Sequence, residues 1–467
     1  MAIGCLTVDF REQLRRTWTK PAHDEHTNGV MNANENSPLL GHSSAEADRT
    51  GFWRNVFLDR RHTPGIDSPN PLVKWPARAF NVTKVTLLSS PINILLVFVP
   101  IGIFAGAHEW DPTTVFTLNF FAIIPLAAVL SFATEEISVR LGDTMGGLLN
   151  ATFGNAVELI VSIVALKAGE IEVVQSSMLG SILSNLLLVL GMCFLLGGIR
   201  HMRDDEGAGI EQTFTTATAQ TTCSLMTLSS ASLVIPAALY AVLDHTSNDQ
   251  DKDSSILFLS RGTAIILLLL YVLYLYFQLR THKNLFTPEA PLLLEEEEEE
   301  QVSMSAFSAG AVLIAVTVVV AICADYLVGS IDDIVQSHHI SKNFIGLILI
   351  PIVGNAAEHV TACVVALRNK MDLAMGVAIG SSIQIALLVT PFLVILGWII
   401  GQPMTLHFET FETIAFAFSV LVVTYIVQDG KSNYLEGAML LGLYMIIALA
   451  FWASPSGALD NYLAPAH

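Results

Sequence analysis

The motif GNAVE at Gly154–Glu158 is nearly repeated 200 residues later as GNAAE at Gly354–Glu358, which is followed by His359. Both copies lie in apolar stretches long enough to cross a bilayer, so each glutamate is expected deep in the hydrocarbon region. A charged side chain there costs about 2.5–3.5 kcal/mol on insertion scales and usually marks an ion pathway. A single such glutamate also fits an ordinary helix–helix hydrogen bond, but two at matched positions predict the halves of one cation site.

The composition indicates an all-α, polytopic membrane protein. The 467 residues are 52% hydrophobic and only 14% charged, and the apolar residues come in long uninterrupted blocks. The formal net charge is −19, with much of the acid clustered in the run Glu295–Glu300, so nucleic acid is excluded as a partner. The five cysteines form no CxxC pair and four lie in apolar runs, which is typical of small buried hydrophobic residues rather than zinc ligands or disulfides.

About eleven transmembrane helices are expected, because one crossing needs about 20 apolar residues. The loops on the side of the N-terminus hold eight Lys or Arg residues against four on the other side, which predicts a cytosolic N-terminus. An odd number of spans then places the C-terminus in the lumen or outside. The approximate limits of the spans are 88–107, 113–137, 144–167, 173–197, 219–243, 256–279, 304–328, 344–367, 372–399, 408–428 and 435–454.

The two motifs fall in the third and eighth spans, so the copies cross the membrane in opposite directions. Similarity extends to Gly146–Leu149 with Gly346–Leu349, and to Met178–Ser181 with Ala378–Ser381. This is the inverted-repeat plan of secondary transporters, which bind substrate near the midplane. The predicted organisation is a disordered cytosolic tail (1–80), an extra helix (88–107), a first five-helix repeat (113–279), a cytosolic acidic linker helix (280–303), a second repeat (304–454) and a luminal tail (455–467).

The residue types in the motif suit a hard cation. Gly154 and Gly354 let backbone carbonyls or another helix approach closely. Asn155 and Asn355 offer amide oxygens, and calcium prefers about 6–8 oxygen ligands. Manganese also accepts oxygen ligands, whereas a soft-metal carrier is disfavoured because no cysteine joins the motif.

The paired carboxylates also predict exchange for protons. Two ionised glutamates balance one divalent ion, but the emptied pair would face desolvation and mutual repulsion, and both effects favour protonation. Protons would therefore replace the departing cation. His359, next to Glu358, either tunes this step by titrating near neutral pH or serves as a gate or packing residue.

Other polar residues in the apolar spans have two interpretations each. Small polar side chains in the fourth and ninth spans either line a pathway or make ordinary helix contacts: Ser181, Ser184, Asn185, Ser381, Ser382 and Gln384. Acidic residues near span ends either form access sites or mark the membrane boundary: Glu135, Glu136 and Asp325.

At these residues the chain resembles the cation/proton exchanger family of the calcium/cation antiporter superfamily, and within it the fungal vacuolar calcium/proton exchangers. The most specific segments are GGLLNATFGNAVELIVS (Gly146–Ser162) and GLILIPIVGNAAEHVT (Gly346–Thr361), and the resemblance covers about 90–454. It implies that Glu158 and Glu358 bind calcium and protons alternately, with the motif asparagines and nearby carbonyls assisting. No cofactor is expected beyond the transported ions.

The resulting expectation is a low-affinity calcium/proton antiporter of the vacuolar membrane and not an enzyme. Sodium- or potassium-coupled exchange, a calcium channel and an intramembrane hydrolase are the alternatives. The acidic run is interpreted as a solvated linker or as a cytosolic segment that concentrates cations or regulates transport; it comprises Glu295, Glu296, Glu297, Glu298, Glu299 and Glu300. The segment ENSPLL (Glu35–Leu40) fits an acidic dileucine sorting signal or an ordinary tail. The oligomeric state stays open.

Overall fold

The computed structural model describes residues 70–203, 207, 209–243, 249–282, 304–338 and 340–453. The chain divides into two compact units, Met1–Leu88 and Ser89–His467. The sorting motif, the acidic run and the C-terminal tail from residue 454 lie outside the described residues. In the first unit the described structure is the helix α3 (Pro71–Leu88), so residues 71–80 are helical where the sequence predicts a disordered tail. Proline suits the first turn of a helix, because the missing N–H has no partner there in any case.

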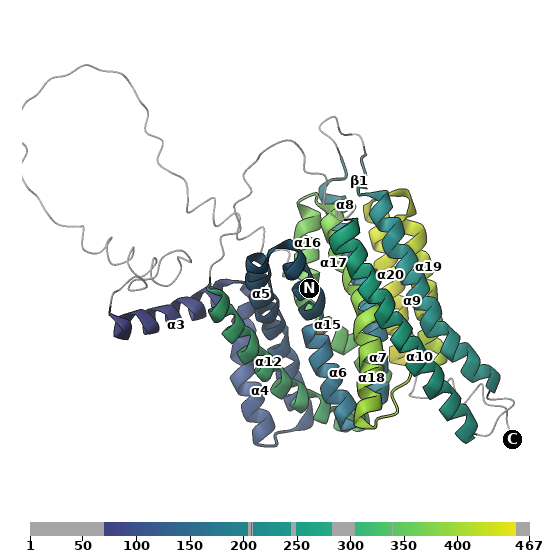
Figure 1. Cartoon of the computed structure of the whole chain (residues 1–467), viewed down its shortest axis with the longest axis horizontal. Coiled ribbons are helices and arrows are strands. Elements are labelled where there is room, and N and C mark those ends of the chain that lie inside the picture. Colours follow the sequence, from purple (N-terminus) through teal and green to yellow (C-terminus); the bar gives the residue numbers. More distant parts are fainter. Residues whose placement is uncertain are drawn as a thin grey trace, which may run out of the picture. The chain divides into compact units, whose positions relative to one another are not determined.

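The second unit is almost entirely helical (Figure 1). Some of its helices begin at side-chain caps. For example, the Asp111 side chain accepts a hydrogen bond from Thr114 N, and Ser341 accepts one from Phe344 N. The first half contains η1 (Pro91–Val97), α4 (Phe98–Ala107), α5 (Pro112–Phe153), α6 (Ala156–Ala168), α7 (Ile171–Leu183), η2 (Ser184–Val189), α8 (Leu190–Arg200), β1 (Gln212–Thr213), α9 (Thr216–Leu243), α10 (Asp249–Tyr276) and η3 (Phe277–Thr281).

The second half repeats this order. In both halves a π-helical turn interrupts the helix that follows the motif, η2 in the first half and η5 in the second. The elements are α12 (Ala306–Gly329), α13 (Ile331–His338), α14 (Lys342–Phe344), η4 (Ile345–Leu349), α15 (Ile350–Gly354), α16 (Ala356–Leu367), α17 (Met371–Gln384), η5 (Ile385–Val389), α18 (Thr390–Ile400), α19 (Thr410–Ile426), η6 (Val427–Asp429), β2 (Lys431–Ser432) and α20 (Tyr434–Ala453).

Eight helices of the described chain are long and apolar enough to cross a membrane, and the count reaches ten if each bent pair of helices is one span. One of these pairs is Lys342–Gly354 with Ala356–Leu367, bent by 59°. The expected third span, 144–167, comprises the end of α5 and α6 up to its penultimate residue. This span does not appear as a separate helix, because α5 continues from residue 112 to 153 and only turns sharply at Gly142, where φ is 75°. The polytopic all-α architecture is confirmed, but the count of eleven spans is not.

The helix contacts are related between the two halves, as an inverted repeat predicts. Helix α8 packs against α20, and the equivalent helix α18 packs against α10. Two further pairs, α5 with α12 and α9 with α19, join equivalent helices of the two halves. The short strands β1 and β2 pair antiparallel at the end of the helices that is uppermost in Figure 1. We call this end the β face, and the opposite end, where Lys342 lies, the Lys342 face.

The two halves differ in one contact. On the Lys342 face, α7 packs tightly against η4 and α15, and residues 345–348 are all buried. Gly180 of α7 lies so close to η4 that a Cβ atom there would overlap the Leu347 carbonyl oxygen. On the β face, α17 has no comparable contact with the described part of the equivalent segment, 143–153, and a Cβ atom at Gly380 would have no heavy atom within 4 Å. One face is therefore closed where its counterpart is open.

Candidate cation-binding site

Both copies of the motif interrupt a membrane helix. Helix α5 ends at Phe153 and α6 begins at Ala156, while α15 ends at Gly354 and α16 begins at Ala356. Asn155 and Asn355 have non-helical backbone angles, with φ of −98° and −88°. A break of this kind exposes the N–H groups of the next helix and the carbonyls of the previous one. Irregular backbone at membrane depth is tolerated where it lines a polar site.

The two glutamates occupy equivalent places after these breaks. Glu158 is in the first turn of α6, and Glu358 is in the first turn of α16. The N-terminal end of a helix carries a partial positive charge that stabilises a carboxylate. Because the repeats are inverted, α6 and α16 run from the breaks toward opposite faces, and both positive ends point into the same region.

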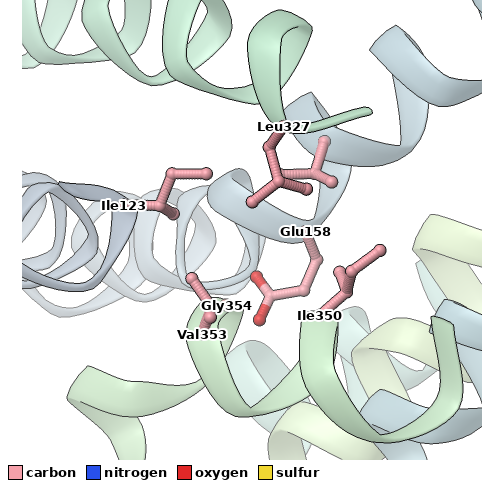
Figure 2. Close-up of a pocket in the computed structure, with 7 residues that line it drawn as sticks. Ile123, Glu158, Leu327, Ile350, Val353 and Gly354 are labelled. Atoms are coloured by element: carbon pink, nitrogen blue, oxygen red, sulfur yellow. The ribbon is translucent and has the colours of Figure 1, made fainter. Parts of the chain in front are cut away.

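Glu158 lies against the opposite repeat. A Cβ atom at Gly354 would be 2.6 Å from Glu158 Oε1, so only glycine leaves room for the carboxylate. Figure 2 shows the carboxylate of Glu158 directed at Gly354 and Val353, beside Ile350. Glu158 is only 4% exposed, and its Oε1 atom has no hydrogen-bond partner. Glu358 is half-buried and close enough to interact electrostatically with Glu158.

A small apolar pocket adjoins the Glu158 carboxylate. It is formed by four elements and lined by Ile123 of α5, Val161 of α6, Leu327 of α12, and Ile350, Val353 and Gly354 of α15 (Figure 2). Sequence reasoning missed this lining. The apolar run before the second motif contained the signal, because Ile350 and Val353 lie five and two residues before Asn355.

Asn155 is the centre of a polar network between the repeats. Its Nδ2 donates to Gln384 Oε1 at 2.8 Å, and its Oδ1 accepts from Ser381 Oγ at 2.8 Å. Asn185 Nδ2 donates in turn to Ser381 Oγ at 3.0 Å. Ser381 also lies within hydrogen-bond reach of Glu358. The structure therefore brings the motif of one repeat to the pathway candidates of the other.

His359 and Ser184 form a second cross-repeat contact, with 3.2 Å between Nε2 and Oγ. His359 is 4% exposed. Buried polar atoms without a hydrogen-bond partner cluster in these elements, and unmet polar groups of this kind cost about 1–3 kcal/mol each. They are Glu158 Oε1, Ser181 Oγ, Asn185 Oδ1, both amide atoms of Asn355, Glu358 Oε2 and His359 Nδ1. Their chemistry fits a hard cation, with carboxylate, amide and hydroxyl oxygens.

Other predicted residues lie apart from this cluster. Ser382 Oγ donates to Ala378 O in its own helix. Glu136 accepts from Met304 N at 3.0 Å and Arg140 contacts Met304 O, so Glu136 anchors the chain just before α12. Glu135 and Asp325 are exposed. The described residues contain no group of three or more His, Cys, Asp or Glu side chains arranged to hold a metal ion.

The broken helices, the inverted packing and the paired carboxylates of Glu158 and Glu358 define a membrane protein of the secondary-transporter class. Residues 112–280 and 308–453 match the family model described as sodium/calcium exchanger protein. The chain belongs to this family. The resemblance to exchangers seen in the sequence is thereby confirmed.

Similar proteins include a vacuolar calcium ion transporter of Schizosaccharomyces pombe, which is 54% identical over 374 residues, or 80% of this chain and 87% of that protein. A Ca²⁺/H⁺ antiporter of Aphanothece halophytica is 44% identical over 378 residues, or 77% of this chain and 96% of that protein. The crystal structure of the selenium-substituted Ca²⁺/H⁺ antiporter YfkE is 36% identical, with a TM-score of 0.64, and the match covers 78% of this chain and 99% of that one.

Proposed function

We propose that this protein is a Ca²⁺/H⁺ antiporter of the vacuolar membrane, with its N-terminus in the cytosol and its C-terminus in the lumen. The observation that carries the proposal is the pairing of the buried Glu158 with the half-buried Glu358 at two helix breaks that face one region. The printed names of the relatives, a vacuolar calcium ion transporter and a Ca²⁺/H⁺ antiporter, support the cargo and the compartment.

In this proposal calcium and protons compete for the glutamates. Calcium binds the two carboxylates together with backbone oxygens at Gly154 and Gly354 and an amide oxygen from the motif asparagines, Asn155 or Asn355, and manganese is a secondary substrate. When the cation leaves, protons take its place, because two charged carboxylates in a low-dielectric site repel each other. An empty charged site is too costly to reorient, so net transport requires the exchange. His359, in contact with Ser184, is the proton relay.

Access to the site alternates between the two membrane faces. The closed contact of α7 with η4 on the Lys342 face, and its missing counterpart between α17 and 143–153, support a state open toward the β face. In this proposal the β face is cytosolic, which the distribution of Lys and Arg supports. Closing α17 onto 143–153 while α7 separates from η4 would expose the same site to the lumen. The acidic run Glu295–Glu300, outside the described residues, would concentrate cations on the cytosolic side.

Sodium-coupled calcium exchange is the second candidate, because the matching family is described as sodium/calcium exchanger protein. A proton-coupled protein takes up calcium under a pH gradient and ignores sodium. A sodium-coupled one requires a sodium gradient instead. A channel needs neither, because it passes calcium down the gradient of calcium itself.

The proposal is tested by calcium uptake into sealed proteoliposomes with an acidic interior. We expect uptake that a protonophore abolishes and sodium does not change. Glu158→Gln and Glu358→Gln should each reduce it at least about 100-fold, since half of the balancing charge is lost. Asp253→Asn, at an exposed position on α10, is the control and should transport normally. Uptake that persists without a pH gradient would refute proton coupling, and normal uptake by Glu358→Gln would refute the site.

A further inference from the structure

The polar network can be compared between the two repeats, because equivalent residues differ by 200 in number. Asn155 of the first repeat meets Ser381 and Gln384 of the second. The equivalent set is Asn355 of the second repeat with Ser181 and Ser184 of the first. If the two motifs acted identically, both asparagines would have equivalent partners.

Asn155 is fully engaged within the protein. It is 1% exposed, its Nδ2 donates to Gln384 and its Oδ1 accepts from Ser381, each at 2.8 Å. Asn155 Nδ2 donates to Gln384 Oε1, while Ser381 Oγ donates to the amide oxygen on the other side. The amide oxygen of Asn155 is therefore held toward Ser381.

The amide of Asn355, in contrast, is unpartnered. It is 0% exposed, and neither its Oδ1 nor its Nδ2 has a hydrogen-bond partner. Ser181, the equivalent of Ser381, also lacks a partner for its hydroxyl. Ser184 stands where the other repeat has Gln384. Its short side chain contacts His359, which itself replaces Leu159 of the first motif.

The free amide of Asn355 belongs to the same region as the free oxygen of Glu158. Asn355 directly follows Gly354, and the Glu158 carboxylate lies against that glycine. A buried amide with both ends unmet is costly unless a ligand or water satisfies it, and an amide oxygen is a suitable ligand for a hard cation. The amide of Asn155 has no such need, since its partners are other side chains.

We propose that the two asparagines of the duplicated motif have different roles. Asn355 supplies the amide oxygen that binds the transported cation, and Gln384 is a positioning residue that holds Asn155 away from it. The inference deepens the cation site of the proposed function and rests on it. One amino-acid difference between the repeats, Gln384 in place of Ser184, makes the halves of the site unequal.

The test measures calcium and manganese binding to the purified full-length protein in detergent, at fixed pH. Asn355→Ala should weaken calcium binding at least about tenfold and change the ratio of calcium to manganese affinity, because a ligand is lost. Asn155→Ala should change both affinities by less than about threefold and leave their ratio unchanged, as expected for a group outside the first coordination sphere. Asn355→Asp, which keeps an oxygen in place, should retain calcium binding.

Double variants test the role of Gln384. Asn155→Ala with Gln384→Ala should be no worse than the more affected single variant, because the two residues share one hydrogen bond. Asn355→Ala with Gln384→Ala should combine as independent effects. A larger loss, or a changed metal ratio, in Asn155→Ala would overturn the proposal, as would binding within about threefold of the native protein in Asn355→Ala.

If an alanine variant melts below the assay temperature, the serine variant of the same asparagine is measured instead. The same limits on calcium affinity, about tenfold and about threefold, apply to it. This binding assay needs no pH gradient. Calcium binding with the expected pattern but without proton-driven uptake would therefore refute the antiporter and leave the division of roles standing.

Discussion

At the scale of single residues, the site depends on how closely Glu158 approaches the opposite repeat. The carboxylate occupies the space where any residue other than glycine at position 354 would place its Cβ atom, 2.6 Å from Oε1. Such a contact is far inside van der Waals distance, and the obstacle is the charged group of the site rather than a flexible surface side chain.

Gly354→Ala should therefore displace Glu158 and reduce calcium uptake into proteoliposomes at least about tenfold, a change of 1.4 kcal/mol or more. Gly442→Ala in α20 is the matched control, since a Cβ atom there meets no heavy atom within 4 Å. It should transport normally, because alanine replaces glycine in a helix without loss of stability. Equal uptake by both variants would show that the position of Glu158 does not matter.

At the scale of helices, the closed and open contacts of the two repeats set up a second prediction. A Cβ atom at Gly380 meets no heavy atom within 4 Å in the state described here, so we expect this state to accommodate Gly380→Leu. It should fold and bind calcium normally, yet lose at least about 90% of uptake, because closing α17 onto 143–153 would overlap the new side chain. Gly180→Leu is the opposite case: its side chain would overlap the Leu347 carbonyl, so this variant should fail to hold the present state.

The measurement compares calcium binding in detergent with uptake in liposomes for both glycine variants. Gly380→Ala adds only a methyl group, so it should lose less uptake than Gly380→Leu. Normal uptake by Gly380→Leu would show that α17 does not approach 143–153 during transport.

The sequence predicts some of these elements and not others. Glu158 and Glu358 can be recognised in the sequence because a charge in an apolar run is costly, and here one occurs at the same position of both motifs. The bond from Asn155 to Gln384 joins residues 229 positions apart, and no local pattern encodes which asparagine finds a partner. The predicted connection between the spans 113–137 and 144–167 includes Gly142, but the sequence does not show that the helix continues on both sides with a single non-helical residue at Gly142. The open and closed contacts are also invisible in the sequence, since both repeats carry a glycine at the contact position of the helix after the motif, Gly180 and Gly380.

At the scale of the whole second unit, an ion pair joins the two halves on the Lys342 face. Lys342 Nζ lies 2.7 Å from Glu170 Oε2 in the first half and 2.7 Å from Asp332 Oδ1 in the second. The side chains of Lys342 and Glu170 are 25% and 18% exposed, so this pair is screened less than the one to the largely exposed Asp332. We infer that it favours the closed contact of α7 with η4.

Glu170→Gln should weaken that closure by about 0.5–1 kcal/mol, the usual contribution of a partly exposed pair. Amide hydrogen exchange in residues 343–350 should then become about two- to fivefold faster, while exchange on the β face stays unchanged. Asp333→Asn, at an exposed neighbouring position, is the control. Unchanged exchange in Glu170→Gln would mean that the ion pair does not hold the Lys342 face closed.

The first turns of α6 and α16 have a consequence for the speed of the cycle. Each helix directs a partial positive charge of roughly half an elementary charge toward the carboxylates. These fields help to keep the glutamates ionised, but they also repel a bound cation and shorten its residence time. A storage protein gains from holding calcium for minutes, whereas a carrier must release each ion before the next can be loaded. The opposed helix ends suit the second requirement: a site that captures its ion and soon lets it go.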